Sequence, residues 1–547
     1  MPVRGLEQEL IEKEIAQRLT VEILAKETIG IDGSWFARKY SSFQRNRQVA
    51  LYGVNRTILS AVEQIIAALS KIESRVVWIW SGIVPLTDLG RNPALTNRID
   101  KLERGWNQYR AKEVHLAQKT WNSAVGYEET KRMINQKLSE LGVEIVNAPY
   151  SAAAQGAYMV RQRYLDRFFG TTDYFLFAGA GSLILDFVFA DQIRRGGVSH
   201  VRVVGHAALC KALEVSGHKL SELLLLLGCE YCPTVTEFSV DFKFEKVRQA
   251  YLAESSGLSW LRSSSGSSGG QEYLQKFLRA KACVEYHPVL TENGNLVCLK
   301  GGEPPSDLDL IFGKRLPDRA YLDFAKGSCS LEYLRGLAFQ EMYLICPDEV
   351  FRAIRGLVDE LYRTGVKFVV EGLEGRKERD AYVSAHESGV GLEWKKEVGL
   401  VDGLSEAVQI LIFWLAKQDV GLLDRVFVFN AVWDEIEYQE EIDWSVLEFV
   451  EGAKFGLDVV ENVCRLGGGS AKESGSEMGL DPVNGWRMAG VLQSIRKKKE
   501  VPGEAFKYLN KNLGFCKALL RFCDKNPGIA PALASDLACL VRATERK

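Results

Sequence analysis

Two cysteines flank an acidic residue in the segment Gly228-Cys-Glu-Tyr-Cys232, which follows a strongly apolar stretch. Such a pair could contribute two ligands to a structural zinc ion, or it could carry thioredoxin-like chemistry after a strand. Structural zinc needs four ligands, and the sequence offers no second Cys or His pair at a suitable spacing. The preceding stretch resembles a helix and not a strand. We therefore expect neither a zinc site nor redox chemistry here.

Two further acidic residues lie near the ends of strand-like segments. Segments rich in branched and aromatic residues alternate with helical patterns, which predicts an α/β fold with a parallel sheet flanked by helices. The strand candidates cover 28–32, 76–80, 143–146, 174–177, 183–187 and 201–204, and the helix candidates cover 55–69, 95–119 and 152–167. Right-handed crossovers bring the carboxyl ends of parallel strands to one edge. We expect that edge to receive Asp32 and Ser81, with Asp173 nearby.

The second half of the sequence differs in composition from the first. The run Ser263-Ser-Ser-Gly-Ser-Ser-Gly-Gly270 is typical of flexible coil, and we place a linker at 253–272. Proline and glycine punctuate the following region, 273–345, and helical periodicity dominates 346–547. The sequence therefore predicts an α/β domain over 1–252, a middle domain and a mostly α-helical C-terminal domain.

Charge and hydropathy exclude several classes of protein. The chain has 547 residues and a formal net charge of −2, so binding to nucleic acid would need a local basic patch. No apolar run approaches the ~20 residues of a membrane span, and the N-terminus lacks the apolar core of a secretory signal. The 11 cysteines have no regular spacing, which is typical of reduced thiols. We expect a cytoplasmic protein without a membrane segment.

The segment around Glu230 also resembles the Gly-Cys-Asp-Tyr-Cys turn of the flap endonuclease and XPG family, a PIN-like nuclease superfamily. Other landmarks of that family follow in the same order over about residues 1–240. They are Thr28-Ile-Gly-Ile-Asp32, Val77-Trp-Ile-Trp-Ser-Gly82, Gly142-Val-Glu-Ile-Val-Asn-Ala-Pro149 and Thr171-Thr-Asp-Tyr-Phe-Leu-Phe177. The resemblance implies a flap endonuclease-like parallel sheet for the first domain.

That family cuts nucleic acid with two metal ions, which a cluster of carboxylates must hold. The resemblance assigns seven acidic positions to Asp32, Ser81, Ser151, Ala153, Thr171, Asp173 and Glu230. Only Asp32, Asp173 and Glu230 keep a carboxylate, so we expect an inactive nuclease-like domain without a cofactor. These three acids would then cap strand ends or helix amino termini in contact with solvent. A single magnesium ion on Asp32 and Asp173 is the alternative.

The degenerate acidic positions and the long extension resemble the maintenance-of-killer-toxin (MKT) post-transcriptional regulators. The stretches Tyr286-His-Pro-Val289 and 306–327 are similar to that family's middle region. The resemblance implies control of messenger RNA translation or stability, with an ataxin-2-like partner that itself binds poly(A)-binding protein. We expect this partner to dock on the residues that follow the linker, 273–547.

A basic helix pattern lies in the region where the nucleases thread single strands. Its cations are Arg98, Lys101, Arg104, Arg110 and Lys112. Acidic residues on the same helix favour a solvated face of mixed charge as the alternative to RNA contact. Two other hypotheses for the whole protein therefore stay open, a structure-specific, metal-dependent flap-type nuclease and a scaffold without nucleic-acid contact.

Overall fold

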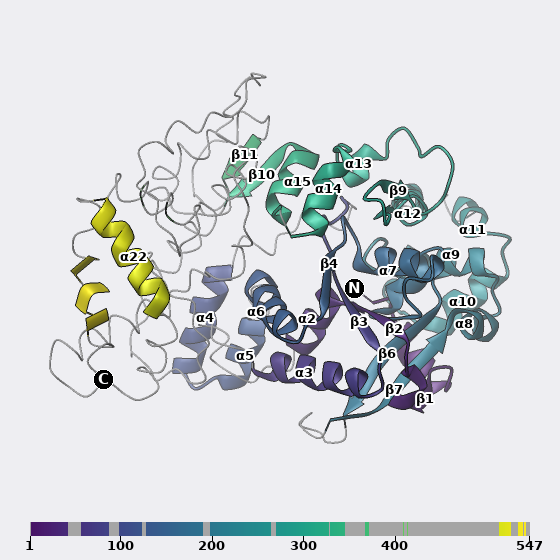
Figure 1. Ribbon diagram of the computed structural model, residues 1–547. Coiled ribbons are helices and arrows are strands. Elements are labelled where there is room, and N and C mark those ends of the chain that lie inside the picture. Colours follow the sequence, from purple (N-terminus) through teal and green to yellow (C-terminus); the bar gives the residue numbers. More distant parts are fainter. Residues whose placement is uncertain are drawn as a thin grey trace. The chain divides into compact units, whose positions relative to one another are not determined.

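The computed structural model describes residues 2–41, 56–86, 98–122, 127–189, 197–263, 270–327, 329–344, 367–370 and 513–526, together with 409, 413, 534–535, 537–539 and 541–542. The protein forms two compact units. Figure 1 labels their helices and strands. The first contains residues 1–44, 56–93 and 127–334, and the second contains residues 45–55, 94–126 and 335–547. No helix among the described residues is both long enough and apolar enough to cross a membrane.

A seven-stranded sheet forms the centre of the first unit, in the order β1-β7-β6-β5-β2-β3-β4. The strands are β1 (Gln17–Thr20), β2 (Thr28–Asp32), β3 (Arg75–Trp80), β4 (Glu144–Asn147), β5 (Arg167–Phe169), β6 (Ser182–Phe189) and β7 (Val198–Gly205). The run from β6 through β5, β2 and β3 to β4 is parallel, whereas β7 pairs antiparallel with β6 and with β1. The predicted α/β class with a mostly parallel sheet is thus confirmed.

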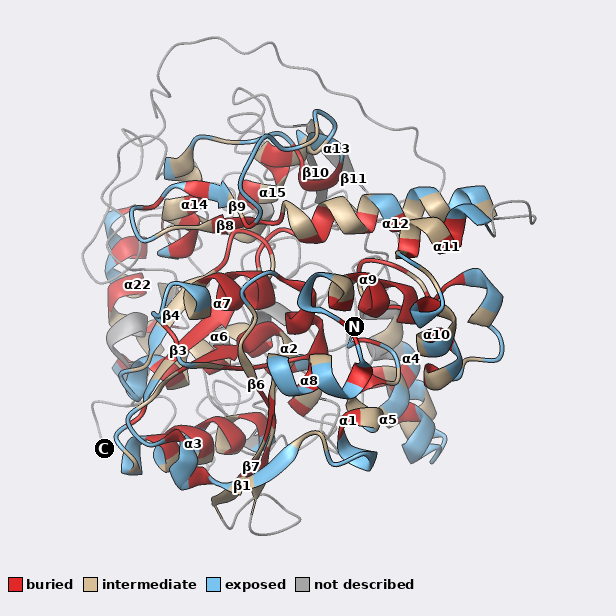
Figure 2. Cartoon of the chain, turned by 90° about the vertical axis from the view of Figure 1, so that its right-hand side faces the viewer, coloured by how far each residue is buried: buried red, intermediate tan, exposed pale blue. Residues whose placement is uncertain are grey.

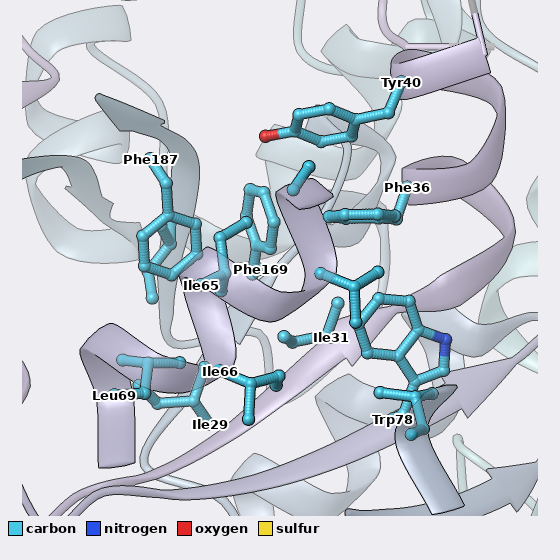
Figure 3. Packing of buried hydrophobic residues seen from close by; sticks show 14 of the residues in the cluster. Ile29, Ile31, Phe36, Tyr40, Ile65, Ile66, Leu69, Trp78, Phe169 and Phe187 are labelled. Atoms are coloured by element: carbon cyan, nitrogen blue, oxygen red, sulfur yellow. The ribbon is translucent and has the colours of Figure 1, made fainter. Parts of the chain in front are cut away.

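One face of the sheet is covered by α2 (Gly33–Ser41), α3 (Arg56–Lys71) and α6 (Tyr127–Glu140). Alternate residues of β2, Ile29 and Ile31, point into this layer and are fully buried. Figure 3 shows them packed with aromatic rings of neighbouring elements, including Phe36 and Trp78, whose ring centroids lie 4.9 Å apart. This core fixes the direction in which β2 and β3 present their carboxyl ends.

The other face is covered by α7 (Ala152–Arg161), which contacts β2, β3 and β5. Glycines allow this close approach. A Cβ atom at Gly30 would lie 2.5 Å from a methyl group of Leu165, and one at Gly156 would lie 2.4 Å from the ring of Phe168. Most residues of α7 and of α9 (Gly217–Leu227) are buried, as Figure 2 shows.

Shorter elements complete the first unit. They are α1 (Leu6–Glu12), η1 (Val21–Leu24), η3 (Thr172–Leu176), α8 (His206–Leu213), η4 (Thr236–Phe238), α10 (Phe244–Leu252), α11 (Gly257–Ser263), α12 (Gly270–Glu285), β8 (Pro288–Leu290), β9 (Leu296–Cys298), α13 (Asp309–Phe312) and α14 (Asp318–Ala325). Helix α15 (Leu331–Phe339) follows. Residues 270–325 therefore pack within the first unit, and the predicted boundary at 252–273 does not coincide with the boundary between the units.

The segment predicted as a linker, 253–272, is largely helical where it is described. Leu258, Trp260 and Leu261 have helical spacing, and Trp260 and Leu261 are buried in α11. Residues 264–269 of the Ser/Gly run lie outside the described residues. Helix α11, which buries apolar residues next to the Ser/Gly run, thus occupies part of the predicted linker.

The strand predicted at 174–177 and the end of the helix predicted over 152–167 are both wrong, and packing explains each difference. A strand is predicted at 174–177, but 172–176 form the 3₁₀ helix η3, which buries Tyr174, Phe175 and Leu176 together. The ring of Tyr174 stacks on Phe168 at 4.9 Å, and its hydroxyl oxygen accepts the amide of Gly181. The helix predicted over 152–167 ends at Arg161, so that β5 can pair between β2 and β6.

The second unit contains α4 (Arg98–Arg110), α5 (Val114–Asn122), β10 (Glu341–Leu344), β11 (Lys367–Val370) and α22 (Leu513–Lys525). Lys112 has a left-handed φ of 67°, which ends the helix predicted over 95–119 and separates α4 from α5. Strand β11 lies within the region 346–547, which is predicted to be mostly helical, and it pairs parallel with β10. Most of that region lies outside the described residues.

Candidate functional site

The seven positions assigned by the resemblance lie on five segments of the first unit. Asp32 ends β2, Ser81 follows β3, Ser151 and Ala153 begin α7, Thr171 and Asp173 lie at η3, and Glu230 follows α9. Ser81 reaches α7, because its Oγ accepts the main-chain amide of Ala152 at 3.1 Å. A Cβ atom at Gly170 would lie 3.3 Å from the Cβ of Asp32, so the residues before Thr171 run beside the end of β2. The carboxyl edge of the parallel sheet thus collects these positions.

The two serines cap the amino terminus of α7. Ser151 is its N-cap residue, with extended backbone angles, and its Oγ accepts the amide of Ala154 at 3.4 Å. Ser81 accepts the amide of Ala152, and its own amide donates to Oγ of Ser34 at 2.9 Å. Both hydroxyl oxygens therefore satisfy amides that a helix leaves without partners. Ala153 is buried in the first turn and offers no oxygen.

Asp32 also caps a helix. Its Oδ1 accepts the main-chain amide of Trp35 at 2.9 Å, in the first turn of α2. The predicted capping role is observed, but Asp32 and Asp173 are each only 3% exposed, so the expected contact with solvent is wrong for both. Residues near the amino terminus pack beside η3, where the amide of Val3 donates to Oγ1 of Thr172 at 3.0 Å. Glu230 is half-buried.

Burial controls the protonation of these carboxyl groups. Desolvation, with a smaller contribution from the charge of Glu230, raises the pKa of Asp32 to about 6 and that of Asp173 to about 8. Although burial also disfavours charge on Glu230, nearby positive charge, including that of Arg38, lowers its pKa. At neutral pH, Asp173 therefore holds its proton for most of the time, while Asp32 and Glu230 are ionised. Thr171 is buried, and its hydroxyl has no hydrogen-bond partner among the described residues.

A histidine that sequence reasoning passed over is central to this edge. His287 is fully buried, and its Nε2 accepts the main-chain amide of Ser151 at 3.2 Å. Its Nδ1 lies 3.2 Å from the carbonyl oxygen of Cys283, which identifies Nδ1 as the protonated nitrogen. Burial lowers the pKa of His287 to about 3, so the ring is neutral. The motif Tyr286-His-Pro-Val289 stands out in the sequence, but nothing in it indicates a partner 136 residues earlier.

The cysteines beside Glu230 do not form a metal site with other described residues. Among the described residues, no three His, Cys, Asp or Glu side chains are grouped as metal ligands would be. Cys229 and Cys232 are buried free thiols, and Sγ of Cys232 contacts the hydroxyl of Tyr273 at 3.6 Å. Desolvation raises the pKa of Cys229 well above its ordinary value, which disfavours the thiolate.

The candidate RNA-binding cations lie in the second unit, on α4 and the turn that follows it. Arg104, Arg110 and Lys112 are exposed, and Lys101 is half-buried. Arg98 begins α4. Helices α4 and α5 form a hairpin in which Trp121 packs against Gly105 and lies 5.8 Å from the ring of Tyr109. The structure thus presents three of the five predicted cations to solvent on one hairpin.

No known protein-family profile matches the sequence. It is similar to the post-transcriptional regulator MKT1 of Cryptococcus neoformans var. grubii, with 21% identity over 399 residues. The aligned region covers 66% of this chain and 50% of the relative, so the chain spans about half the length of the curated relative it matches. The resemblance to MKT post-transcriptional regulators that the sequence indicated is thereby confirmed.

Several solved nucleases also have a similar fold. The catalytic core of Rad2 in complex with DNA has a TM-score of 0.36 at 15% identity, over 59% of this protein and 95% of the other. Human GEN1 in complex with Holliday junction DNA has a TM-score of 0.35 at 18% identity, over 65% and 79%. Flap endonuclease-1 from Methanococcus jannaschii has a TM-score of 0.32 at 15% identity, over 61% and 95%.

Proposed function

We propose that this protein, as a relative of the MKT1 regulators, is a post-transcriptional regulator of messenger RNA whose nuclease-like domain does not cut nucleic acid. The observation that carries the absence of cleavage is the set of residues at the start of α7, where the resemblance expects acids and the chain has none. Oγ of Ser81 and of Ser151 accept helix amides, and Ala153 has no ligand atom. This part of the edge therefore stabilises a helix where a nuclease would hold metal.

The remaining carboxylates do not fit two-metal chemistry. Two divalent cations need several ionised oxygens between them, because the metals must be held while they neutralise the charge of attacking and leaving oxygens. Only Asp32, Asp173 and Glu230 remain, and Asp173, with a pKa of about 8, must first lose a proton. A single magnesium ion on Asp32 and Asp173 would face the same cost. We therefore propose that regulation needs no metal.

A tethering experiment tests this function directly. The full-length protein is fused to an RNA-binding coat protein and recruited to a reporter messenger RNA. The double variant Asp32→Asn/Asp173→Asn keeps the size of both side chains and removes two of the three carboxylates. We expect the wild type to change reporter protein or transcript level, and the variant to do so equally. A change that disappears in the variant would instead favour the alternative function, a metal-dependent flap-type nuclease.

A cytoplasmic site of action and an ataxin-2-like partner that binds poly(A)-binding protein belong to this proposal. Partner capture should use the full-length protein, because a cut at residue 272 would separate residues 286–325 from the sheet on which they pack. Co-purification of such a partner with the full-length protein supports the proposal, and its absence contradicts the partner assignment.

Direct RNA contact is a second component, favoured by the exposed cations of the α4–α5 hairpin. The net charge of the protein is −2, so attraction to RNA must come from a local group of cations. Arg104, Arg110 and Lys112 form such a group and are available to contact phosphates. Crosslinking of RNA to residues 98–122 would support this contact. Crosslinking confined to other segments would exclude the hairpin as the RNA-binding surface.

A further inference from the structure

Residues 286–325, which follow α12, pack along the carboxyl edge of the sheet. Figure 2 shows β8, β9 and α14 beside α7 and β4 in this unit. Strand β8 is tied to α7 by the side chain of Gln155, whose Nε2 donates to the carbonyl oxygen of Leu290 while its Oε1 accepts the amide of the same residue, both at 2.9 Å. One amide side chain thus satisfies both main-chain groups at the end of β8.

Other polar contacts join the same segment to the last residue of β4 and to residues that follow β3 and β4. The hydroxyl of Tyr150 donates to the carbonyl oxygen of Phe312 at 2.9 Å. Nδ2 of Asn147 donates to the carbonyl oxygen of Phe324 at 3.1 Å, and the amide of Leu86 donates to that of Ile311 at 2.7 Å. Together with the bonds to Leu290, these contacts hold the segment near residues 290, 311–312 and 324.

An aromatic cluster closes around the imidazole of His287. Phe177 lies 5.1 Å from it and Phe312 lies 5.2 Å from it, measured between ring centroids. Tyr231, next to Glu230, lies at 6.2 Å, and Tyr150 lies at 6.1 Å. All four rings are buried and meet the imidazole edge to face. The space between the start of α7 and the turn after α9 is therefore filled with side chains.

We propose that residues 286–325 are a built-in cover, latched by His287, that closes the carboxyl edge where β3, β4 and α7 meet and keeps external ligands from it. This inference goes beyond the proposed function, because a cover could lie over an active or an inactive site. It explains why polar groups at this edge, such as the amide of Ser151, are satisfied from within the protein. Any ligand of the first unit would then bind away from this edge.

Hydrogen–deuterium exchange of the full-length protein, followed by mass spectrometry, tests the cover. In the wild type, peptides from 150–156 and from the buried parts of the cover, 287–290 and 311–313, should exchange as slowly as helix α9. The double variant Tyr150→Phe/His287→Leu removes the donors Tyr150 Oη and His287 Nδ1 and the acceptor His287 Nε2 without opening a large cavity. We expect exchange in these peptides to rise at least tenfold. Exchange in 217–227 should not change.

Tyr251→Phe is the matched control. It removes a buried tyrosine hydroxyl that contacts Oε2 of Glu222 at 3.2 Å and does not contact the cover. This variant should leave exchange at 150–156 unchanged. If the double variant does not fold, Tyr150→Phe alone retains the ring packing and should show a several-fold rise confined to the same peptides. His287→Gln, which can still accept a hydrogen bond, should restore part of the protection lost in His287→Leu.

Three results would overturn the proposal. Exchange at 287–290 and 311–313 that is already fast in the wild type would mean that the segment does not close the edge. An unchanged rate at 150–156 in the variants would mean that His287 and Tyr150 do not hold the segment. An equal rise in 217–227 would mean that both residues serve the core in general and not a cover.

Discussion

The main-chain amide of Ser151 donates to Nε2 of His287 at 3.2 Å, so that an imidazole binds the amino terminus of α7. The resemblance to flap endonucleases places a carboxylate at Ser151. A carboxylate there would favour cations, whereas a neutral imidazole accepting an amide stabilises the helix terminus and adds no charge. The partner of this amide thus comes from a distant part of the sequence.

The neutral state of His287 makes stability depend on pH. Its pKa of about 3 in the folded protein lies below the ordinary value of 6.5, so the unfolded state binds more protons between these values. Stability should fall as the pH decreases from 6.5 toward 3, by up to about 1.4 kcal/mol per pH unit. Urea unfolding of the wild type and of His287→Gln at several pH values should show this slope only in the wild type. The exposed His218→Gln should follow the wild type, and equal slopes in all three proteins would contradict the prediction.

Asp173 should have the opposite effect on the pH profile. Its folded pKa of about 8 lies above the ordinary value of 3.8, so the folded state binds more protons and stability falls as the pH rises through this interval. Asp173→Asn cannot ionise and should gain stability relative to the wild type up to pH 8, by at most about 1.4 kcal/mol per unit. Denaturation at pH 5, 6, 7 and 8 measures the gain, with the exposed Asp241→Asn as control. A variant that is less stable than the wild type at pH 8 would show that the ionised carboxylate has a structural use.

The hydroxyl of Ser151 should contribute measurably to stability. Removal of a serine N-cap costs about 1 kcal/mol, within a range of roughly 0.5–2 kcal/mol. Ser151→Ala should therefore lose about that amount, whereas Ser151→Asn, which keeps an acceptor oxygen, should lose less. Ser70→Ala, on the exposed side of α3, should stay within about 0.5 kcal/mol of the wild type. Chemical denaturation measures these changes in stability. Equal losses in Ser151→Ala and Ser70→Ala would contradict the capping role of Ser151.

Much of the fold could be predicted from local pattern. The strand predicted at 28–32 is β2 without any shift. The strand predicted at 76–80 begins one residue after β3, and the strand predicted at 143–146 is shifted by one residue from β4. Branched and aromatic residues bounded by polar ones carry this signal. The strand β5 escapes prediction because it has only three residues, and a helical pattern runs up to it.

The site was less predictable, because its partners come from long range. The carboxyl edge, with Asp32 and Ser81, followed from the alternation of strands and helices. The contact of Ser151 with His287 joins residues 136 apart, and no periodicity links them. The burial of Asp32 and Asp173 likewise depends on packing by other segments, so the sequence suggested solvated acids where the structure has buried ones.

Charge reversal on the α4–α5 hairpin tests the RNA component. Arg104→Glu/Arg110→Glu replaces two exposed cations, so affinity for a single-stranded RNA should fall at least tenfold. The dependence of log K on log salt should flatten by about 0.7 for each lost phosphate contact. Fluorescence anisotropy at several salt concentrations measures both quantities. The control Lys71→Glu/Lys211→Glu changes the same charge at exposed positions of the first unit, and an equal loss of affinity there would rule out a specific role for the hairpin.

Incubation with nucleic acid and divalent metal tests most directly the proposal that this protein does not cut nucleic acid. The purified full-length protein is mixed with labelled flap, hairpin and single-stranded substrates in Mg²⁺ or Mn²⁺, beside Asp32→Ala purified in the same way. Because Ser81, Ser151 and Ala153 leave too few carboxylates for two cations, we predict that the wild type produces no more product than Asp32→Ala or a reaction with chelator. Metal-dependent cleavage by the wild type that disappears in Asp32→Ala would contradict the account.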